Sequence, residues 1–219
     1  MIKAIFMDYT GTMVQESGEE LKTVVGRICR HSDLHEPTAV MRVWWSLVKE
    51  YEEASYGADY LTEDEIVDKA LQKMAGTIHL EEDLGELHQL IQGFWVHAPL
   101  FPDVKPFLER CPVPVYVISN NGIQYVEESL KEKGISTAGI VCADMVRAYK
   151  PHRELFERAL EHSGRRADEV LHVGDSYQSD VQGARSAGIR PVLIRRGGTE
   201  THEDMTTVRE LTEMLDLLS

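Results

Sequence analysis

The sequence has few cysteines and no long hydrophobic segment. Its three cysteines, Cys29, Cys111 and Cys142, are odd in number and widely spaced, which argues against a disulfide framework or a thiolate metal site and favours buried, reduced thiols. No run of about 18 apolar residues is present to span a bilayer. The amino terminus has no basic segment followed by an apolar core, as a secretory signal would have. We therefore expect a cytoplasmic protein that does not insert into a membrane.

Basic residues are also scarce. The chain has 23 Lys and Arg against 37 Asp and Glu, a formal net charge of -14. A surface that binds nucleic acid or an anionic membrane needs a stripe of Lys and Arg, so we expect neither as a partner. An anionic substrate would be repelled by the overall field unless local cations or a bound metal opposed it. The histidines show no spacing typical of a metal site.

The first residues form an apolar segment that ends in an acid and a glycine turn. Residues 2–7 predict a buried strand, which is followed at once by Asp8-Tyr9-Thr10-Gly11-Thr12. In an open α/β sheet, ligands bind at the carboxyl ends of the strands. We therefore expect this strand to deliver the Asp8 carboxylate to a binding crevice.

Four segments with helical periodicity follow, without a strand signal between them. Their apolar stripes run from Leu21 to Cys29, from Val40 to Tyr51, from Ile66 to Met74 and from Leu84 to Trp95. The third helix is predicted to begin at a capping box made by Thr62 and Glu65. Consecutive amphipathic helices predict a helical-bundle domain over residues 15–97, inserted into a second domain.

From Pro99 onward, strand and helix patterns alternate. Strands are predicted at 113–119, 139–143, 169–174 and 191–195. One helix is predicted to end at Gly134, and another is predicted to span Pro151 to Ser163 with Gly164 as its cap. The last twenty residues predict a polar turn and one more helix. This alternation predicts an α/β fold class, with a Rossmann-like core of residues 1–14 and 98–219 around a mostly parallel sheet.

Four polar motifs lie where predicted strands end or helices begin. They are Asp8 to Thr12, Ser119-Asn120-Asn121-Gly122, Lys150-Pro151, and Gly174-Asp175 through Asp180. In this order and placement they resemble the four motifs of the haloacid dehalogenase-like (HAD) hydrolase superfamily. The resemblance covers the α/β part of the chain, and the insert resembles a HAD cap domain only in its position between the first two motifs.

Three acids at one edge of a sheet predict a cation site. If Asp8, Asp175 and Asp180 meet there, a hard divalent cation with oxygen ligands, Mg²⁺, would relieve their mutual repulsion. The resemblance implies that Asp8 is a nucleophile that forms an aspartyl-phosphate. It also implies that the Thr10 backbone carbonyl and Asp175 ligate the metal, whereas Asp180 acts through water or orients Lys150.

The second and third motifs are expected to hold the phosphoryl group. The resemblance implies that the Ser119 hydroxyl, the Asn120 backbone N–H and the Lys150 ammonium bind its oxygens, with Lys150 neutralising charge as it develops. The substrate we expect is a small phosphorylated metabolite, and the protein a monomer or a homodimer.

Thr10 departs from the family pattern. HAD phosphatases usually have an aspartate two residues after the nucleophile, where it serves as the general acid and base. A threonine hydroxyl cannot do this work at neutral pH, so slow phosphate-ester hydrolysis is expected. Three alternatives stay open: 2-haloacid dehalogenation, which needs neither that proton nor a metal; carbon–phosphorus cleavage like that of phosphonoacetaldehyde hydrolase; and a non-catalytic role in binding a phosphorylated ligand or a protein. A P-type ATPase, which also has threonine here, is excluded because no membrane segment is predicted.

Side chains of the insert are expected to set the substrate. Carbon–phosphorus cleavage would need a Schiff-base lysine, but Lys22, Lys49, Lys69 and Lys73 match no such pattern and are expected to face solvent. Trp44 and Trp95 fall on apolar stripes and are expected in the core. The remaining candidates for substrate contact are Glu16, Arg42 and Trp45.

Overall fold

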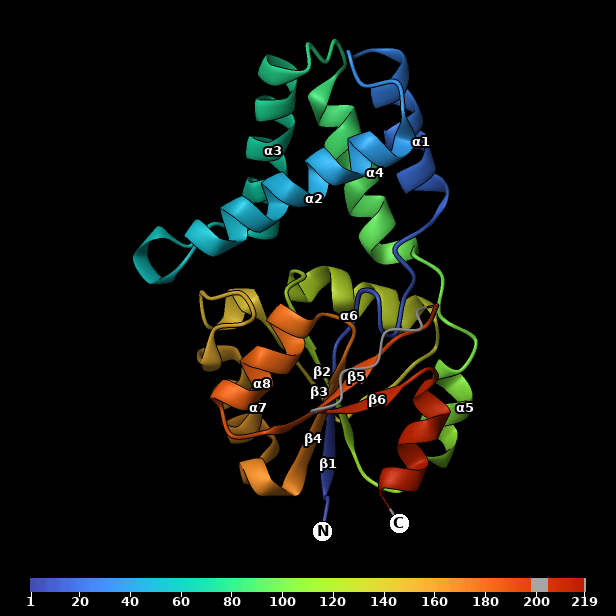
Figure 1. Cartoon of the computed structure of the whole chain (residues 1–219), viewed down its shortest axis with the longest axis vertical. Helices are drawn as coiled ribbons and strands as arrows, with labels where there is room; N and C mark the ends of the chain where they lie inside the picture. The colour runs from blue at the N-terminus through green and yellow to red at the C-terminus, as the bar shows by residue number, and fades with distance from the viewer. Residues whose placement is uncertain (198–204, 219) are drawn as a thin grey trace. The chain divides into compact units, whose positions relative to one another are not determined.

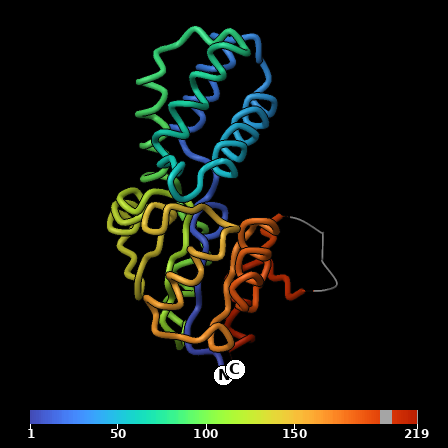
Figure 2. The backbone as a smooth tube through the Cα atoms, turned by 90° about the vertical axis from the view of Figure 1, so that its left-hand side faces the viewer, coloured from blue at the N-terminus to red at the C-terminus, as the bar shows by residue number. Residues whose placement is uncertain are grey.

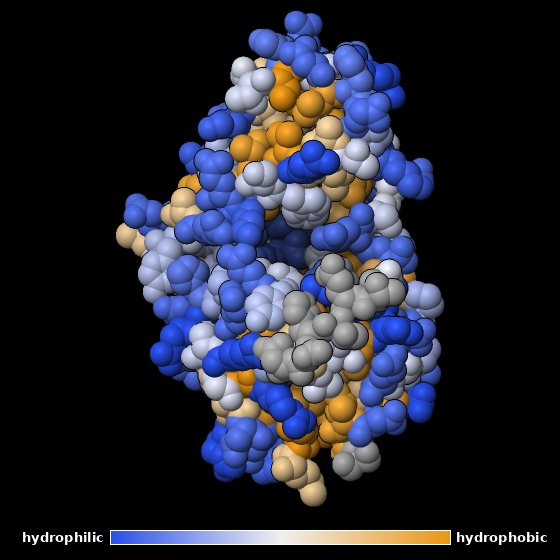
Figure 3. Space-filling model, viewed as in Figure 1, coloured by the Kyte–Doolittle hydropathy of each residue, from blue (hydrophilic) through white to orange (hydrophobic). Residues whose placement is uncertain are grey.

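A computed structural model describes residues 1–197 and 205–218, and it divides the chain into two compact units (Figure 1). The α/β unit comprises residues 1–16 and 99–219, and the helical unit comprises residues 17–98. Within the described ranges, no helix has both the length and the apolar character needed to cross a membrane. Hydrophilic side chains cover most of the face seen in Figure 3, in keeping with the net charge of -14.

The α/β unit is built on a six-stranded parallel sheet with the strand order β3-β2-β1-β4-β5-β6. The strands are β1 (Ala4–Met7), β2 (Val115–Ser119), β3 (Gly139–Cys142), β4 (Val170–Gly174), β5 (Arg190–Ile194) and β6 (Thr206–Val208). All four residues of β1 are fully buried, because a central parallel strand is covered on both faces. β1 has β2 on one side and β4 on the other, so the strand order changes direction at β1. Sheets of this kind bind ligands at that point.

Helices cover both faces of this sheet. The helices α7 (Arg153–Ser163) and α8 (Gly183–Ser186) lie on one face, and α5 (Val104–Arg110) and the 3₁₀ helix η5 (Leu211–Leu217) lie on the other (Figure 1). α6 (Ile123–Glu132) packs beside β3. Short turns complete the unit: η2 (Ala143–Met145), η3 (Ala167–Glu169) and the π-helical turn η4 (Tyr177–Gln182). Phe6, Leu155 and Phe156 belong to the core between the sheet and α7.

The helical unit packs four helices side by side (Figure 2). They are α1 (Glu19–Arg30), α2 (Pro37–Ala54), α3 (Glu63–Thr77) and α4 (Leu84–His97), with the short turn η1 (Gly57–Asp59) after α2. The predicted capping box between Thr62 and Glu65 is confirmed at the start of α3. Trp44 and Trp95 are each 8% exposed and Trp45 is 37% exposed, as their positions on and off the apolar stripes predicted.

The structure corrects several sequence predictions. α5 and β6 were not predicted, and α7 begins at Arg153 rather than at Pro151, although Gly164 caps it in the left-handed conformation as expected. The predicted final helix is the 3₁₀ helix η5, and much of the predicted polar turn before it lies outside the described residues. The three cysteines are free thiols, but Cys29 and Cys111 are only half-buried.

Candidate active site

The first and fourth motifs meet because β1 and β4 are adjacent parallel strands. Met7 pairs with Val173, and the backbone N–H of Asp8 donates to the carbonyl of Val173 at 2.9 Å. Asp8 and Asp175 therefore leave neighbouring strands at the same edge of the sheet. The predicted convergence of these two motifs is observed.

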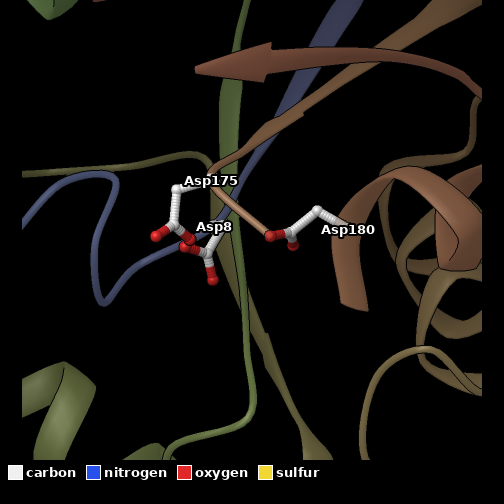
Figure 4. A group of neighbouring side chains, drawn as sticks. All are labelled: Asp8, Asp175 and Asp180. Carbon is white, nitrogen blue, oxygen red and sulfur yellow. The ribbon is translucent and has the colours of Figure 1, made fainter. Parts of the chain in front are cut away.

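Three carboxylates gather at this edge (Figure 4). Asp8, Asp175 and Asp180 each offer an oxygen, and these oxygens lie within 4.8 Å of one another. Asp8 and Asp180 are buried, with 5% and 1% exposure, whereas Asp175 is half-buried. In Figure 4 the Asp8 and Asp175 carboxylates lie side by side, and Asp180 points toward them from the turn after β4. The group belongs entirely to the α/β unit.

Glycines allow the carboxylates to approach so closely. Gly11 has a φ of +83°, and a Cβ atom on it would collide with the Asp175 carboxylate. A Cβ on Gly174 would likewise collide with the Asp180 side chain, which folds back over the end of β4. The π-helical turn η4 makes this fold possible, and the Ser176 backbone N–H donates to Asp180 Oδ2 at 3.0 Å.

Lys150 is the cation among these acids. Its Nζ donates to Asp8 Oδ1 at 2.5 Å and to Asp180 Oδ1 at 2.7 Å, and its side chain is only 3% exposed. Its backbone N–H donates to Asn120 Oδ1 at 2.7 Å, which ties the second motif to the third. When all three carboxylates are ionised, the one ammonium leaves two negative charges uncompensated.

Burial and this charge excess shift the pKa values of the group. Burial, reinforced by Asp180 and opposed by Lys150, raises the pKa of Asp8 to about 7. Burial, with the charges of Asp180 and Glu16, raises the pKa of Asp175 to about 7. Burial also acts to raise the pKa of Asp180, but Lys150 and His172 more than offset it and hold that pKa below its usual range. Asp180 and Lys150 therefore form the permanent ion pair, and Asp8 and Asp175 carry the unbalanced charge.

Ser119, Thr10 and Asn121 form a hydrogen-bond cluster beside Asp8. The hydroxyls of Thr10 and Ser119 both donate to Asn121 Oδ1, at 2.8 and 2.9 Å, and the Asn121 backbone N–H donates to Ser119 Oγ at 3.1 Å. Sequence reasoning overlooked the side chain of Asn121, although the doubled asparagine of the second motif was the available signal.

Two further residues secure the loops that carry the acids, and neither was predicted. Arg195 Nη1 donates to the carbonyl of Asp175 at 2.6 Å, and Arg196 Nη2 donates to the carbonyl of Thr12 at 2.6 Å. Both follow directly after β5, so they connect this strand to the first and fourth motifs. No family motif marks them, because they act through backbone carbonyls.

The carboxylates fit a hard divalent cation. All three donors are oxygens, the class that Mg²⁺ and Ca²⁺ prefer. Asp8 Oδ2 is buried and has no hydrogen-bond partner among the described residues, and a buried acceptor of this kind normally has one. A divalent cation would balance the two excess negative charges. Asp8, Asp175 and Asp180 could therefore hold a metal ion.

The candidates for substrate contact, Glu16, Arg42 and Trp45, lie apart in the sequence and are all exposed. All four lysines of the insert are exposed, as predicted, and so is Arg42. Glu16 belongs to the α/β unit, and partial desolvation together with the charge of Asp8 raises the pKa of this exposed side chain.

Comparisons with known proteins agree with this geometry. A phosphoglycolate phosphatase from Yersinia pestis is 27% identical over 197 residues, which cover 85% of this chain and 78% of that protein. An (S)-2-haloacid dehalogenase 4A from Burkholderia cepacia is 26% identical over 164 residues, which cover 71% and 70%. The solved L-2-haloacid dehalogenase from Xanthobacter autotrophicus has the same fold, with a TM-score of 0.82, 20% identity, and coverage of 100% of this chain and 98% of that one.

Matches to other curated relatives are shorter and cover 46%, 28% and 42% of those proteins. The family model of the haloacid dehalogenase-like hydrolases matches residues 2–188, which include all four motifs. With six parallel strands, a helical insertion between β1 and β2, and this match, the chain belongs to the haloacid dehalogenase-like hydrolase family.

Proposed function

We propose that the protein is a Mg²⁺-dependent phosphatase that acts on a small phosphorylated metabolite through Asp8. The observation that carries this proposal is the group of Asp8, Asp175 and Asp180, whose three carboxylates outnumber the one ammonium, Lys150, that pairs with Asp8 and Asp180. The phosphatase relative, 27% identical over 85% of the chain, supports it. Haloacid dehalogenases, by family resemblance, use no metal and would not need these acids.

Asp8 and Asp175, with the Thr10 backbone carbonyl, would hold the metal. Bound Mg²⁺ would neutralise the repulsion between the Asp8 carboxylate and an anionic phosphoryl group. In the first step an Asp8 oxygen bonds to phosphorus while the bond from phosphorus to the ester oxygen breaks, and the leaving group departs as an anion. In the second, a water oxygen bonds to phosphorus while the bond from phosphorus to the Asp8 oxygen breaks, which releases inorganic phosphate, gives the water proton to solvent and regenerates the Asp8 carboxylate.

Lys150, Ser119 and Asn120 would hold the transferring group. The Lys150 ammonium already lies 2.5 Å from Asp8 Oδ1, where it can balance charge on the phosphoryl oxygens. The Ser119 hydroxyl would exchange its bond to Asn121 for one to a phosphoryl oxygen. The Asn120 backbone N–H lies at the turn between β2 and α6, a position that favours anions.

Thr10 makes both steps slow. Its hydroxyl donates to Asn121 Oδ1 and cannot protonate the leaving oxygen or activate water at neutral pH. General acid and base catalysis contributes about 10²–10⁴-fold to such reactions. The favoured substrates would have leaving groups that need little protonation, such as acyl phosphates and aryl phosphates.

A substrate panel tests this proposal. Acyl phosphates, sugar phosphates, phosphoglycolate and p-nitrophenyl phosphate are incubated with Mg²⁺ or with EDTA, and released phosphate is measured. We expect Mg²⁺-dependent release that D8N abolishes, D168N at an exposed surface acid preserves, and T10D increases by about 10²–10⁴-fold. Release that D8N leaves unchanged would contradict the role of Asp8.

Thr10 and the dehalogenase relative favour a second candidate function, the hydrolysis of 2-haloacids. An Asp8 oxygen would displace halide from carbon 2, which needs no proton, and water would then hydrolyse the resulting ester. Chloride release from 2-chloropropionate in the presence of EDTA would support this candidate over the first. Absence of chloride release, with phosphate release from the panel, would remove it.

A further inference from the structure

His172 is a polar side chain within the hydrophobic core of the α/β unit. It lies in the middle of β4, two residues after Val170, and so points to the same face of the sheet, the face covered by α7. Its side chain is fully buried, and the ring of Phe156 from α7 meets it edge to face at a centroid distance of 5.0 Å. An apolar residue would fill this position without the desolvation that a histidine requires.

The hydrogen bonding of His172 defines its tautomer. Nε2 lies 3.0 Å from Asp180 Oδ1, whereas Nδ1 is buried and has no partner in the described part of the chain. The bond between Nε2 and Asp180 Oδ1 needs one proton between them. Because Asp180 is a carboxylate and can only accept, that proton is on Nε2 and is donated to Asp180.

Asp180 in turn accepts three hydrogen bonds from the protein. Oδ1 accepts from His172 and from Lys150 Nζ, and Oδ2 accepts from the Ser176 backbone N–H at 3.0 Å. The same Lys150 Nζ donates to Asp8 Oδ1. A continuous chain of hydrogen bonds therefore leads from His172, through Asp180 and Lys150, to the predicted nucleophile.

We propose that His172 is a positioning residue that holds the Asp180 carboxylate, and through it the Lys150 ammonium, against Asp8. The catalytic part of this inference rests on the proposed function, but the positioning of Lys150 does not. If His172 only fills the core, any residue of similar volume will replace it. If it positions Asp180, its replacement must keep a donor where Nε2 lies.

Three substitutions separate these possibilities. In H172Q the amide nitrogen reaches about as far as Nε2 and can donate to Asp180. H172M has a similar reach and no donor, and H172N has a donor that is too short to reach Asp180. These two loss variants therefore lose the hydrogen bond to Asp180 for different reasons. The first test measures acylation of Lys150 by acetic anhydride in the metal-free protein, using mass spectrometry, with the exposed Lys22 as the internal reference.

We expect H172M and H172N to increase the acylation rate of Lys150 by about tenfold or more, the worth of one hydrogen bond to a charged group, and H172Q to stay near the wild type. Alkylation of the buried Cys142 in β3 is the control for general opening of the core and should not change. Unchanged Lys150 acylation in both loss variants, or an equal increase in H172Q, would overturn the proposal.

Kinetics supply the second test. With a substrate from the panel, H172M should lower kcat by about tenfold or more and leave KM unchanged, and H172Q should restore kcat. An unchanged kcat in H172M, with or without an increase in KM, would contradict the positioning role. Failure of every substrate would overturn the proposed function and leave the acylation test of His172 intact.

Discussion

The helical unit and the α/β unit both place two carboxylates around one basic side chain, and the two groups differ in burial. In the helical unit, His88 of α4 lies between Asp64 and Asp68 of α3, with its nitrogens 2.8 and 2.6 Å from their oxygens. Partial burial lowers the pKa of His88, but the two aspartates more than offset this and raise it. Asp68 is 57% exposed, so water solvates the excess negative charge.

In the α/β unit, Lys150 lies between Asp8 and Asp180, but all three are buried. There water cannot solvate the excess charge, and the pKa values of Asp8 and Asp175 rise to about 7. Burial, together with the third carboxylate of Asp175, makes one cluster suited to a metal ion, whereas the more exposed cluster joins two helices. We therefore expect changes in the buried cluster to affect the site far more than the loss of an ion pair in the helical unit.

Removing the buried cation should have the largest effect. K150M leaves the Asp8 and Asp180 carboxylates without their shared donor, and we expect kcat for phosphate release to fall by about 10²–10³-fold. K22M removes an exposed lysine that pairs with Glu19 in the helical unit, and it should leave kcat unchanged. A wild-type kcat in K150M would show that Lys150 is dispensable for transfer.

Moving the acids apart should have the next largest effect. G11A introduces a Cβ that collides with the Asp175 carboxylate at a residue with positive φ, so we expect the free energy of unfolding to fall by more than about 1 kcal/mol and Mg²⁺ affinity to fall as well. Gly134 is the matched control, with a φ of +64° and open space where the methyl group of an alanine would lie. G134A should lower the free energy of unfolding by about 1 kcal/mol. Its Mg²⁺ affinity, measured by titration calorimetry, should not change.

The pH dependence of stability should show the unbalanced charge directly. A carboxyl with a raised pKa binds more protons in the folded than in the unfolded protein, so its folded state is penalised as pH rises from about 4 to the folded value of about 7. We expect the Tm of the metal-free protein to fall over this range because of these groups. D175N should reduce the fall, and Mg²⁺ should reverse it above pH 7.

If the metal-free wild type and D175N show the same dependence of Tm on pH, the raised pKa values are contradicted. The linked expectation is that Mg²⁺ binds more tightly at pH 8 than at pH 6, since protons and the metal compete for Asp8 and Asp175.

Breaking an ion-pair cluster of the helical unit should have the smallest effect on the site. Arg27 of α1 pairs with Glu82 and Glu86, whose side chains are 8% and 60% exposed. R27M should lower the Tm, because it leaves the Glu82 carboxylate without the Arg27 guanidinium, and it should leave Mg²⁺ binding unchanged. A loss of metal binding in R27M would contradict the separation of the two roles.

Much of the fold and of the site could be predicted from local patterns. The end of β1 at Asp8 and the start of α3 at Thr62 follow from apolar runs and capping chemistry that a few neighbouring residues determine. α5 was not predicted because it has only seven residues and contains Pro106, and β6 was not predicted because three residues at a sheet edge carry no clear alternation.

The supporting residues of the site depend on tertiary structure. Asn121 accepts from Thr10 across 111 positions of sequence, and Arg196 reaches Thr12 across 184, so no local spacing announces either contact. His172 resembles an ordinary residue of a buried strand until α7 and η4 close over it. Sequence motifs therefore indicate the acids and the lysine, and the packed structure reveals what holds them.

The number of residues in the π-helical turn after β4 determines where Asp180 lies. The backbone N–H of Val181 donates to the carbonyl of Ser176, five residues earlier, and this wider turn brings Asp180 back over Gly174. Deleting one residue from the turn would restore α-helical spacing and rotate Asp180 by about 100° away from Lys150. A deletion that changes no charged residue would thus dismantle the charge arrangement.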